Sequence, residues 1–198
     1  MTLFSQQGDI PSESYVAKLA RTCLLAMDVD GVLTDGSLAY DSEGREWKQF
    51  HVTDGLGLVL LAQIGVSVAW ITGRSSSIVE RRAQELRIPY LMQGVRDKSK
   101  ALDTVRQQMG IAWEEIAYIG DDWNDLPVFQ AAGVKIAVSN AVTEVKALAD
   151  MVTLREGGKG AVREVCDALL DARGVRASCL ADYLENLRSA RTEEKPIQ

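Results

Sequence analysis

The segment CLLAMDVDGVLTDG, residues 23–36, places two carboxylates, Asp28 and Asp30, at the end of an apolar run. Like charges this close repel each other, and burying either one is unfavourable without a compensating partner. The pair therefore requires a cation, a shared proton or open solvent. Carboxylate oxygens are the ligands that a hard cation such as Mg²⁺ prefers, so a metal site is one candidate.

Further polar side chains follow other apolar runs. They come directly after the strand-like segments VSVAWI and EIAYIG, or begin the helix-like segment between them: Thr72, Gly73, Arg74, Asp121, Asp122, Asp125 and Lys98, with Lys100 as a rival for the last position. In a doubly wound parallel sheet, ligands bind outside the carboxyl ends of the strands. We therefore expect these carboxylates, the hydroxyl and one ammonium to share one edge of the sheet.

This combination of groups suits phosphoryl transfer. A carboxylate such as Asp28 can attack phosphorus and form an acyl phosphate, and a second carboxyl such as Asp30 can protonate the leaving oxygen and then activate water. The hydroxyl of Thr72 and the ammonium of Lys98 can hold the phosphoryl oxygens, over which charge spreads. Each motif alone has an ordinary structural interpretation as a turn, a helix cap or a solvated helix start. Their joint occurrence favours the chemical interpretation.

Apolar runs and helix-like periods alternate along the chain. Strands are predicted at 22–28, 66–72, 115–121, 134–139 and 150–154, and helices at 76–87, 98–110, 124–133, 143–149 and 160–174. The alternation predicts an α/β fold, a doubly wound, Rossmann-like parallel sheet with helices on both faces. We expect residues 1–198 to form a single domain.

Residues 37–52, SLAYDSEGREWKQFHV, interrupt this alternation. Apolar and polar residues alternate on both sides of DSEG, which predicts a β-hairpin inserted after the first strand. The insertion is too short for a cap domain, so we expect a small flap over the edge of the sheet. From about residue 175 the chain becomes a polar, charged tail.

Composition excludes several classes of partner. The net charge of −6 over 198 residues disfavours nucleic acid and anionic membranes. No apolar run approaches the length of a membrane span, and the first residues lack the pattern of a secretion signal. The cysteines Cys23, Cys166 and Cys179 lack metal-type spacing. These features predict a cytoplasmic protein with reduced thiols.

The stretches DVDGVLTDG, ITGR, the lysine at position 98 and GDDWNDLP resemble, in this order, the four motifs of the haloacid dehalogenase superfamily of phosphatases. The resemblance implies that Asp28 is the nucleophile and Asp30 the general acid and base. It also implies that Thr72 and Lys98 hold the phosphoryl group. Some branches of the superfamily lack the second aspartate, so the presence of Asp30 favours hydrolysis.

The same resemblance implies a Mg²⁺ site. Its ligands would be the carboxylates of Asp28 and Asp121 and the main-chain carbonyl of Asp30. Asp122 and Asp125 would orient the shell around the metal.

Longer stretches are similar to the 3-deoxy-D-manno-octulosonate 8-phosphate (KDO 8-phosphate) phosphatases of that superfamily: DGVLTDG, the hairpin, FHVTDGLGL, YLMQGVRDK, YIGDDWNDLPV and GGKGAVREVCDALL. The similarity covers most of residues 23–172. It implies KDO 8-phosphate, a small phosphorylated sugar acid, as the substrate, in lipopolysaccharide or capsular sugar synthesis. It also implies a homotetramer, in which a neighbouring subunit closes a site that has no cap domain.

One position departs from that pattern. The octulosonate phosphatases carry an arginine where this chain has Thr53, and an arginine there can pair with a sugar carboxylate. Phosphatases of nine-carbon sugar-acid 9-phosphates, KDN or N-acetylneuraminate 9-phosphate, vary at this position. The segment GREWKQF, with Glu46 and Lys48, also resembles them, so these substrates are an alternative. The basic residues that could hold the sugar acid are Arg74, Lys159 and Arg163.

Two other functions are compatible with parts of the pattern. A signalling receiver domain shares the parallel sheet, the acidic residues and Mg²⁺, but its phosphoacceptor aspartate ends the third strand. Here the corresponding segment, RIPYLMQG, ends without an aspartate. A non-catalytic scaffold that keeps the fold is the remote alternative, and it has no need of so many unfavourable carboxylates.

Overall fold

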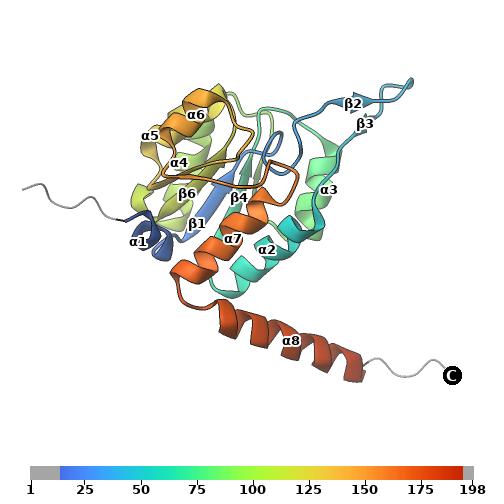
Figure 1. The fold of residues 1–198 in the computed structure, drawn as a ribbon. Helices are drawn as coiled ribbons and strands as arrows, with labels where there is room; N and C mark the ends of the chain where they lie inside the picture. The colour runs from blue at the N-terminus through green and yellow to red at the C-terminus, as the bar shows by residue number, and fades with distance from the viewer. Residues whose placement is uncertain (1–13, 194–198) are drawn as a thin grey trace, which may run out of the picture.

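The computed structural model describes residues 14–193 and contains a six-stranded parallel sheet with helices around it (Figure 1). The strands, in sheet order, are β5 (Tyr90–Met92), β4 (Ser67–Ile71), β1 (Leu24–Met27), β6 (Ile116–Gly120), β7 (Val134–Ala137) and β8 (Met151–Val152). All neighbouring strands run parallel. The predicted doubly wound α/β fold is confirmed.

The first strand lies in the middle of the sheet. β1 pairs with β4 on one side and with β6 on the other, and Met27 lies opposite Trp70 and Ile119. All residues of β1 are buried, as expected for a parallel strand that is covered on both faces. The chain passes from β5 across β1 to β6, so the strand order reverses beside β1. Ligands of such sheets bind at this point, outside the carboxyl ends.

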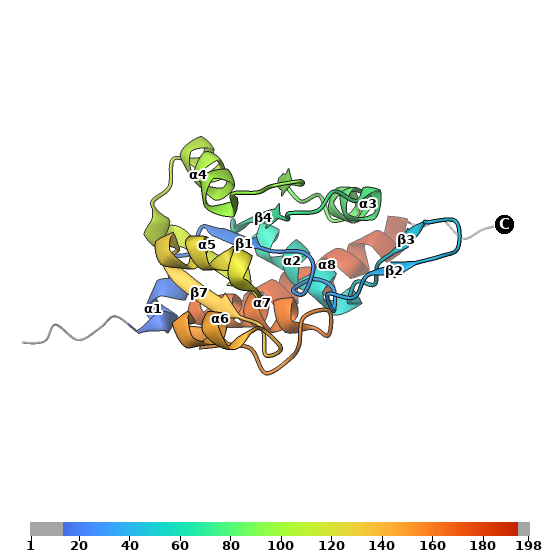
Figure 2. The ribbon, with the colours of Figure 1, turned by 90° about the horizontal axis from the view of Figure 1, so that it is seen from above.

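Helices cover both faces of the sheet. Their bounds are α1 (Tyr15–Ala20), α2 (Val52–Gln63), α3 (Ser77–Glu85), α4 (Lys98–Met109), α5 (Leu126–Ala131), α6 (Thr143–Leu148), α7 (Ala161–Ala172) and α8 (Arg176–Glu193), with short 3-10 turns η1 (Trp113–Glu115) and η2 (Trp123–Asp125). In Figure 2, α2 and α7 lie on one side of the central strands, and α4 and α5 lie on the other. The five predicted helices correspond to α3 through α7, and each end differs by at most two residues.

The helix α2 was not predicted. It follows the hairpin directly and is buried along much of its circumference, so its apolar residues show no single helical face. Its glycines also weaken a helix prediction. Gly57 has a packing reason, because a side chain there would come within 3.0 Å of Cys166 on α7. The glycine therefore allows α2 and α7 to pack closely on one face of the sheet.

The predicted hairpin is confirmed, with a shorter paired part than residues 37–52. β2 (Ala39–Tyr40) and β3 (Glu46–Trp47) form a two-stranded antiparallel sheet that projects from the body of the molecule (Figures 1 and 2). After β3 the chain runs directly into α2, which begins at Val52.

The predicted tail contains a helix. The sequence predicts no helix after residue 175, whereas α8 continues to Glu193 and extends away from the body (Figure 1). Residues 1–13 and 194–198 of the expected single domain lie outside the described residues. Within residues 14–193, no helix combines the length and the apolar character needed to cross a membrane.

Candidate active site

Asp28 follows β1 and lies in a buried group of charged side chains at the edge of the sheet. Only 5% of the residue is exposed. Its Oδ1 accepts a hydrogen bond from the N–H of Val29 at 2.7 Å, and its Oδ2 lies 2.7 Å from Nζ of Lys98. Burial raises the pKa of Asp28 to about 6, although the nearby ammonium of Lys98 opposes the shift.

Lys98 is the first residue of α4, a helix that Asp97 caps. Its Nζ lies 2.7 Å from Asp28 and 2.8 Å from Oδ1 of Asp125. Burial works against the charge of Lys98, but Asp125 and Asp28 outweigh burial and raise its pKa. Lys100, the rival position, is exposed on the same helix. The structure therefore directs Lys98, and not Lys100, toward Asp28.

Asp125 is fully buried and organises the loop after β6. Its Oδ1 accepts hydrogen bonds from Lys98 and from the hydroxyl of Tyr118, at 2.8 and 2.7 Å. Its Oδ2 accepts hydrogen bonds from the main-chain N–H groups of Asp121 and Asp122, at 2.9 and 3.3 Å. Asp125 thus fixes the backbone that carries Asp121. Asp122 itself is exposed and accepts a hydrogen bond from the next main-chain N–H.

Asp121 completes a cluster of three carboxylates. One oxygen each of Asp28, Asp121 and Asp125 lies within 4.8 Å of the other two. Within the described part of the chain, Oδ1 of Asp121 is buried and has no hydrogen-bond partner. Burial, together with the charges of Asp125 and Asp28, raises the pKa of Asp121 to about 8. Three neighbouring carboxylates, one of them half-buried with a buried, unpaired oxygen, form a donor set that a hard divalent cation fits.

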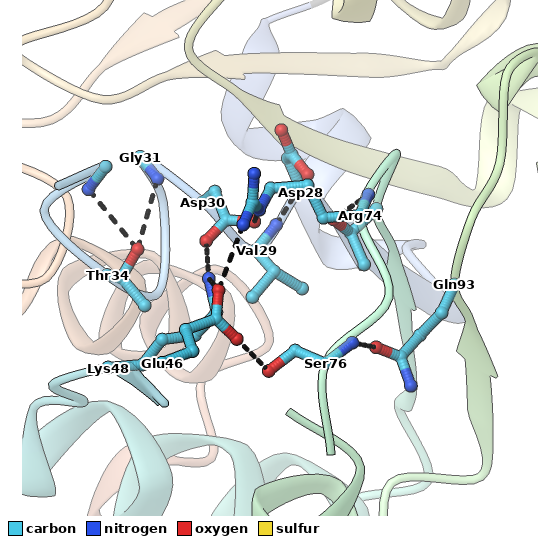
Figure 3. Close-up of polar contacts among 12 residues, drawn as sticks. Asp28, Val29, Asp30, Gly31, Thr34, Glu46, Lys48, Arg74, Ser76 and Gln93 are labelled. Carbon is cyan, nitrogen blue, oxygen red and sulfur yellow. Dashed lines mark hydrogen bonds and ion pairs between the residues drawn. The ribbon is translucent and has the colours of Figure 1, made fainter. Parts of the chain in front are cut away.

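Gly31 allows the loop after β1 to approach this cluster. Its φ of 97° lies in the left-handed region, and a Cβ atom there would come 2.0 Å from Oδ2 of Asp121. A residue with a side chain would therefore displace Asp121. The hydroxyl of Thr34 accepts hydrogen bonds from the N–H groups of Gly31 and Gly36, at 3.4 and 3.3 Å, and so holds the loop in this shape (Figure 3).

Asp30 lies beside the cluster, in contact with the hairpin (Figure 3). Nζ of Lys48 donates a hydrogen bond to its Oδ1, and Nε of Arg74 lies 3.8 Å from its Oδ2. Glu46 joins the two cations, since its Oε1 lies 3.1 Å from Arg74 and 3.5 Å from Lys48. The hydroxyl of Ser76 donates to Oε2 of Glu46 at 2.6 Å. Although Glu46 is partly buried, the bonds from Ser76 and Arg74 lower its pKa.

Thr72 and Gly73 follow β4 on the same edge of the sheet. Thr72 is 2% exposed, and its Oγ1 accepts the main-chain N–H of Arg74 at 3.2 Å. Gly73 is exposed, so its main chain lies open beside Thr72. Both residues thus lie directly after β4, and their part in the site stays a prediction.

Three residues considered for the sugar acid lie outside these contacts. Oγ1 of Thr53 lies 2.7 Å from Nδ1 of His51. Thr53 and Arg163 line a surface hollow of about 610 Å³ along α7, and none of the residues lining that hollow belongs to the carboxylate cluster. Arg163 pairs with Asp167 at 2.8 Å. Lys159 is exposed on the loop before α7.

Two contacts of the site were not predicted from the sequence. Tyr118 was assigned only to a strand, yet its hydroxyl is fully buried against Asp125. Lys48 was noted only as part of a resemblance, and its bond to Asp30 joins positions 18 residues apart. The one available signal was the alternation of Glu46 and Lys48, which directs both toward the same face of the hairpin.

Comparisons with known proteins agree with this arrangement. A family model of haloacid dehalogenase-like hydrolases matches residues 77–164. The 3-deoxy-D-manno-octulosonate 8-phosphate phosphatase KdsC of Haemophilus influenzae is 45% identical over 157 residues, which are 79% of this chain and 87% of that protein. KdsC of Escherichia coli is 43% identical over 163 residues, which are 82% of this chain and 87% of that protein.

A solved structure has the same architecture. It is the 3-deoxy-D-manno-octulosonate 8-phosphate phosphatase of Moraxella catarrhalis, in complex with a magnesium ion, a phosphate ion and a KDO molecule. The two structures superpose with a TM-score of 0.83 at 45% identity, over 86% of this chain and 98% of that one. The resemblance seen in the motifs is thereby confirmed, and the chain belongs to the 3-deoxy-D-manno-octulosonate 8-phosphate phosphatase family of haloacid dehalogenase-like hydrolases.

Proposed function

We propose that the protein is a Mg²⁺-dependent phosphatase that hydrolyses KDO 8-phosphate to KDO and phosphate. The observation that carries the proposal is the group formed by Asp28, Lys98 and Asp125 at the edge of the sheet, with Asp30 beside it. The relative from Moraxella catarrhalis, which shares the fold, is described with magnesium, phosphate and KDO. We further propose that residues 1–198 act as one catalytic domain.

The proposed metal ligands are Asp28, Asp121 and the main-chain carbonyl of Asp30. The unpaired oxygen of Asp121 and its proximity to Asp28 support this choice. Asp125 is occupied by Lys98, Tyr118 and two main-chain N–H groups, so it orients Asp121. Asp122 is assigned to the surroundings of the metal. Bound Mg²⁺ would offset the charges of the carboxylates and of the phosphoryl oxygens.

In the first step, a carboxylate oxygen of Asp28 attacks phosphorus, and the bond between phosphorus and the sugar oxygen breaks. The carboxyl of Asp30 gives its proton to that leaving oxygen, so the products are the free sugar acid and an aspartyl phosphate at Asp28. Thr72 and Lys98 hold the phosphoryl oxygens during the transfer. The contact of Lys98 with Asp28 supports its assignment to this position.

In the second step, the oxygen of a water molecule attacks phosphorus, and the carboxylate of Asp30 takes a proton from that water. The bond between Asp28 and phosphorus breaks, phosphate leaves, and both aspartates return to their starting states. One aspartate thus serves as acid and then as base. The position of Asp30 beside Asp28, but outside its buried cluster, supports this division of roles.

The substrate group beyond the phosphate is assigned to Arg74 and Glu46, which pair on the hairpin side of Asp30, and to the main chain of Gly73, which precedes Arg74. Thr53 and Lys159 are the other candidates that the sequence offers for this role, and neither contacts Asp30 in the described part of the chain. The nine-carbon substrates, KDN and N-acetylneuraminate 9-phosphate, are the second candidate, because Thr53 replaces the arginine of the octulosonate phosphatases.

We also propose a homotetramer. An isolated two-stranded hairpin is marginally stable in water, and this one exposes large apolar side chains. Leu38, Tyr40 and Trp47 are 53%, 55% and 64% exposed. Neighbouring subunits that cover these side chains would also close a site that lacks a cap domain. A cytoplasmic location is proposed as well, and the three free thiols are compatible with it.

The test is phosphate release by the purified protein from KDO 8-phosphate, KDN 9-phosphate and N-acetylneuraminate 9-phosphate, side by side, in Mg²⁺ and in EDTA. We expect the largest kcat/KM for KDO 8-phosphate, with activity lost in EDTA and restored by Mg²⁺. A preference for a nine-carbon substrate would replace the substrate assignment and leave the chemistry in place. Activity that is indifferent to EDTA would contradict the metal assignment.

A further inference from the structure

We infer that Lys48 is a positioning residue that holds the carboxyl of Asp30 where it exchanges a proton with the leaving oxygen. The inference rests on the proposed function, in which Asp30 is the general acid and base. It assigns to the hairpin a part in the chemistry, in addition to any contact with substrate or with neighbouring subunits.

The two oxygens of Asp30 have different surroundings (Figure 3). Oδ1 accepts a hydrogen bond from Nζ of Lys48, whereas Oδ2 has only Nε of Arg74 nearby, at 3.8 Å, which is too long for a hydrogen bond. In the described part of the chain, no other hydrogen bond to this carboxylate is found. Lys48 therefore anchors one oxygen and leaves the other available to carry the proton.

Lys48 is better suited to this task than Arg74. The side chain of Lys48 is 2% exposed, whereas that of Arg74 is 40% exposed. Arg74 also donates to Tyr40 and Glu46 through Nη2, at 2.8 and 3.1 Å. A buried single donor restricts a carboxylate more than a half-exposed guanidinium that is engaged elsewhere.

The hairpin itself directs Lys48 inward. Successive side chains of an extended segment alternate between faces, so Glu46 and Lys48 face the site, while Trp47 between them is 64% exposed. Glu46 is bound by Ser76 on the far side and contacts both Lys48 and Arg74. Lys48 is therefore held toward Asp30 by the direction of the hairpin and by its contact with Glu46.

The consequence depends on the leaving group. A sugar alkoxide is a poor leaving group and needs the proton of Asp30, whereas p-nitrophenolate is stable without protonation. General acid catalysis contributes roughly 10²–10⁴-fold to rate. A variant that loses the correct position of Asp30 should therefore slow the release of a sugar much more than the release of p-nitrophenolate, whereas the later attack of water, for which Asp30 is the base, should slow equally with both substrates.

The experiment compares kcat/KM of Lys48→Met on KDO 8-phosphate and on p-nitrophenyl phosphate, because kcat/KM reports the formation of the aspartyl phosphate and excludes the later attack of water that both substrates share. We expect kcat/KM for the sugar phosphate to fall by about 100-fold and kcat/KM for p-nitrophenyl phosphate by less than about tenfold, since only the sugar needs the proton of Asp30 in order to leave. The matched control is Arg45→Met, on the same hairpin. Arg45 is 69% exposed and pairs with Asp41 and Glu43, and the control should retain both activities.

A double-mutant cycle with Asp30→Asn separates positioning from other roles. If Lys48 acts through Asp30, then Lys48→Met should lower the residual rate of Asp30→Asn no further. Equal losses of kcat/KM on both substrates, an unchanged kcat/KM on KDO 8-phosphate or additive effects in the cycle would overturn the inference. Failure of the proposed function would instead appear in the wild-type protein, as an absence of phosphate release from KDO 8-phosphate.

Discussion

Replacing Asp121 with asparagine should stabilise the Mg²⁺-free protein and abolish its response to Mg²⁺. Burial and the charges of Asp125 and Asp28 raise the pKa of Asp121 from 3.8 to about 8. A carboxyl group with a raised folded-state pKa binds its proton more tightly in the folded protein than in the unfolded chain. Its contribution to stability is therefore present at low pH and is lost as the pH rises from about 4 toward 8.

The magnitude follows from the same shift. The interval between 3.8 and pH 7 is roughly three pKa units, and at about 1.4 kcal/mol per unit the effect has an upper bound of about 4 kcal/mol. Asparagine has no proton to bind, so the variant lacks this cost. Because 1 kcal/mol shifts the melting temperature of a chain of this size by about 2–4 °C, we expect Asp121→Asn to melt several degrees above the wild type in EDTA.

Thermal unfolding at pH 7, followed by circular dichroism in EDTA and in MgCl₂, provides the assay. The wild type should gain stability from Mg²⁺, as binding to the folded state requires, whereas Asp121→Asn should not gain any and should release no phosphate. Asp182→Asn is the matched control, because Asp182 is exposed on α8 and lies outside the carboxylate cluster. A lower melting temperature of Asp121→Asn in EDTA, or a Mg²⁺ response of wild-type size, would refute the reasoning.

Three other variants test separate parts of the molecule. Asp28→Asn should lower kcat by at least about 10³-fold, as expected for loss of the nucleophile, with an unchanged circular dichroism spectrum; wild-type activity, without deamidation of the new asparagine, would remove Asp28 from that role. Arg173→Ala should lower the free energy of unfolding by about 2 kcal/mol in a denaturant titration, because Arg173 donates to the carbonyls of Ile64 and Thr22 at 2.9 and 2.5 Å; an unchanged value would show that these bonds add nothing. Trp47→Ser should shift the protein toward smaller oligomers in light scattering, since Trp47 is 64% exposed on the hairpin; a monomeric wild type would contradict the proposed tetramer.

The sequence predicted the sheet because its strands are short apolar runs that end in polar residues. β1 and β6 are buried on both faces, so they appear as continuous apolar segments. An aspartate directly follows each of them. The helix α2 was missed for the opposite reason. Its burial is not confined to one face, and Gly57 makes sense only once α7 packs against it.

The site was less accessible to sequence reasoning than the fold. The choice between Lys98 and Lys100 depends on the direction in which each side chain leaves α4, and only Lys98 reaches Asp28. The bond from Lys48 to Asp30 depends on how the hairpin folds back over the sheet edge. Local spacing does not contain such information, because both contacts join segments that are distant in the chain.

The most direct measurement of the central claim is the covalent state of Asp28 during turnover. Wild-type protein with KDO 8-phosphate and Mg²⁺ would be quenched in acid within the first turnover, digested and mapped by mass spectrometry. The account predicts a phosphoryl group on the peptide that contains Asp28, sensitive to hydroxylamine and absent from Asp28→Asn. Active turnover with no phosphorylated peptide, or with the phosphoryl group on another residue, would contradict it.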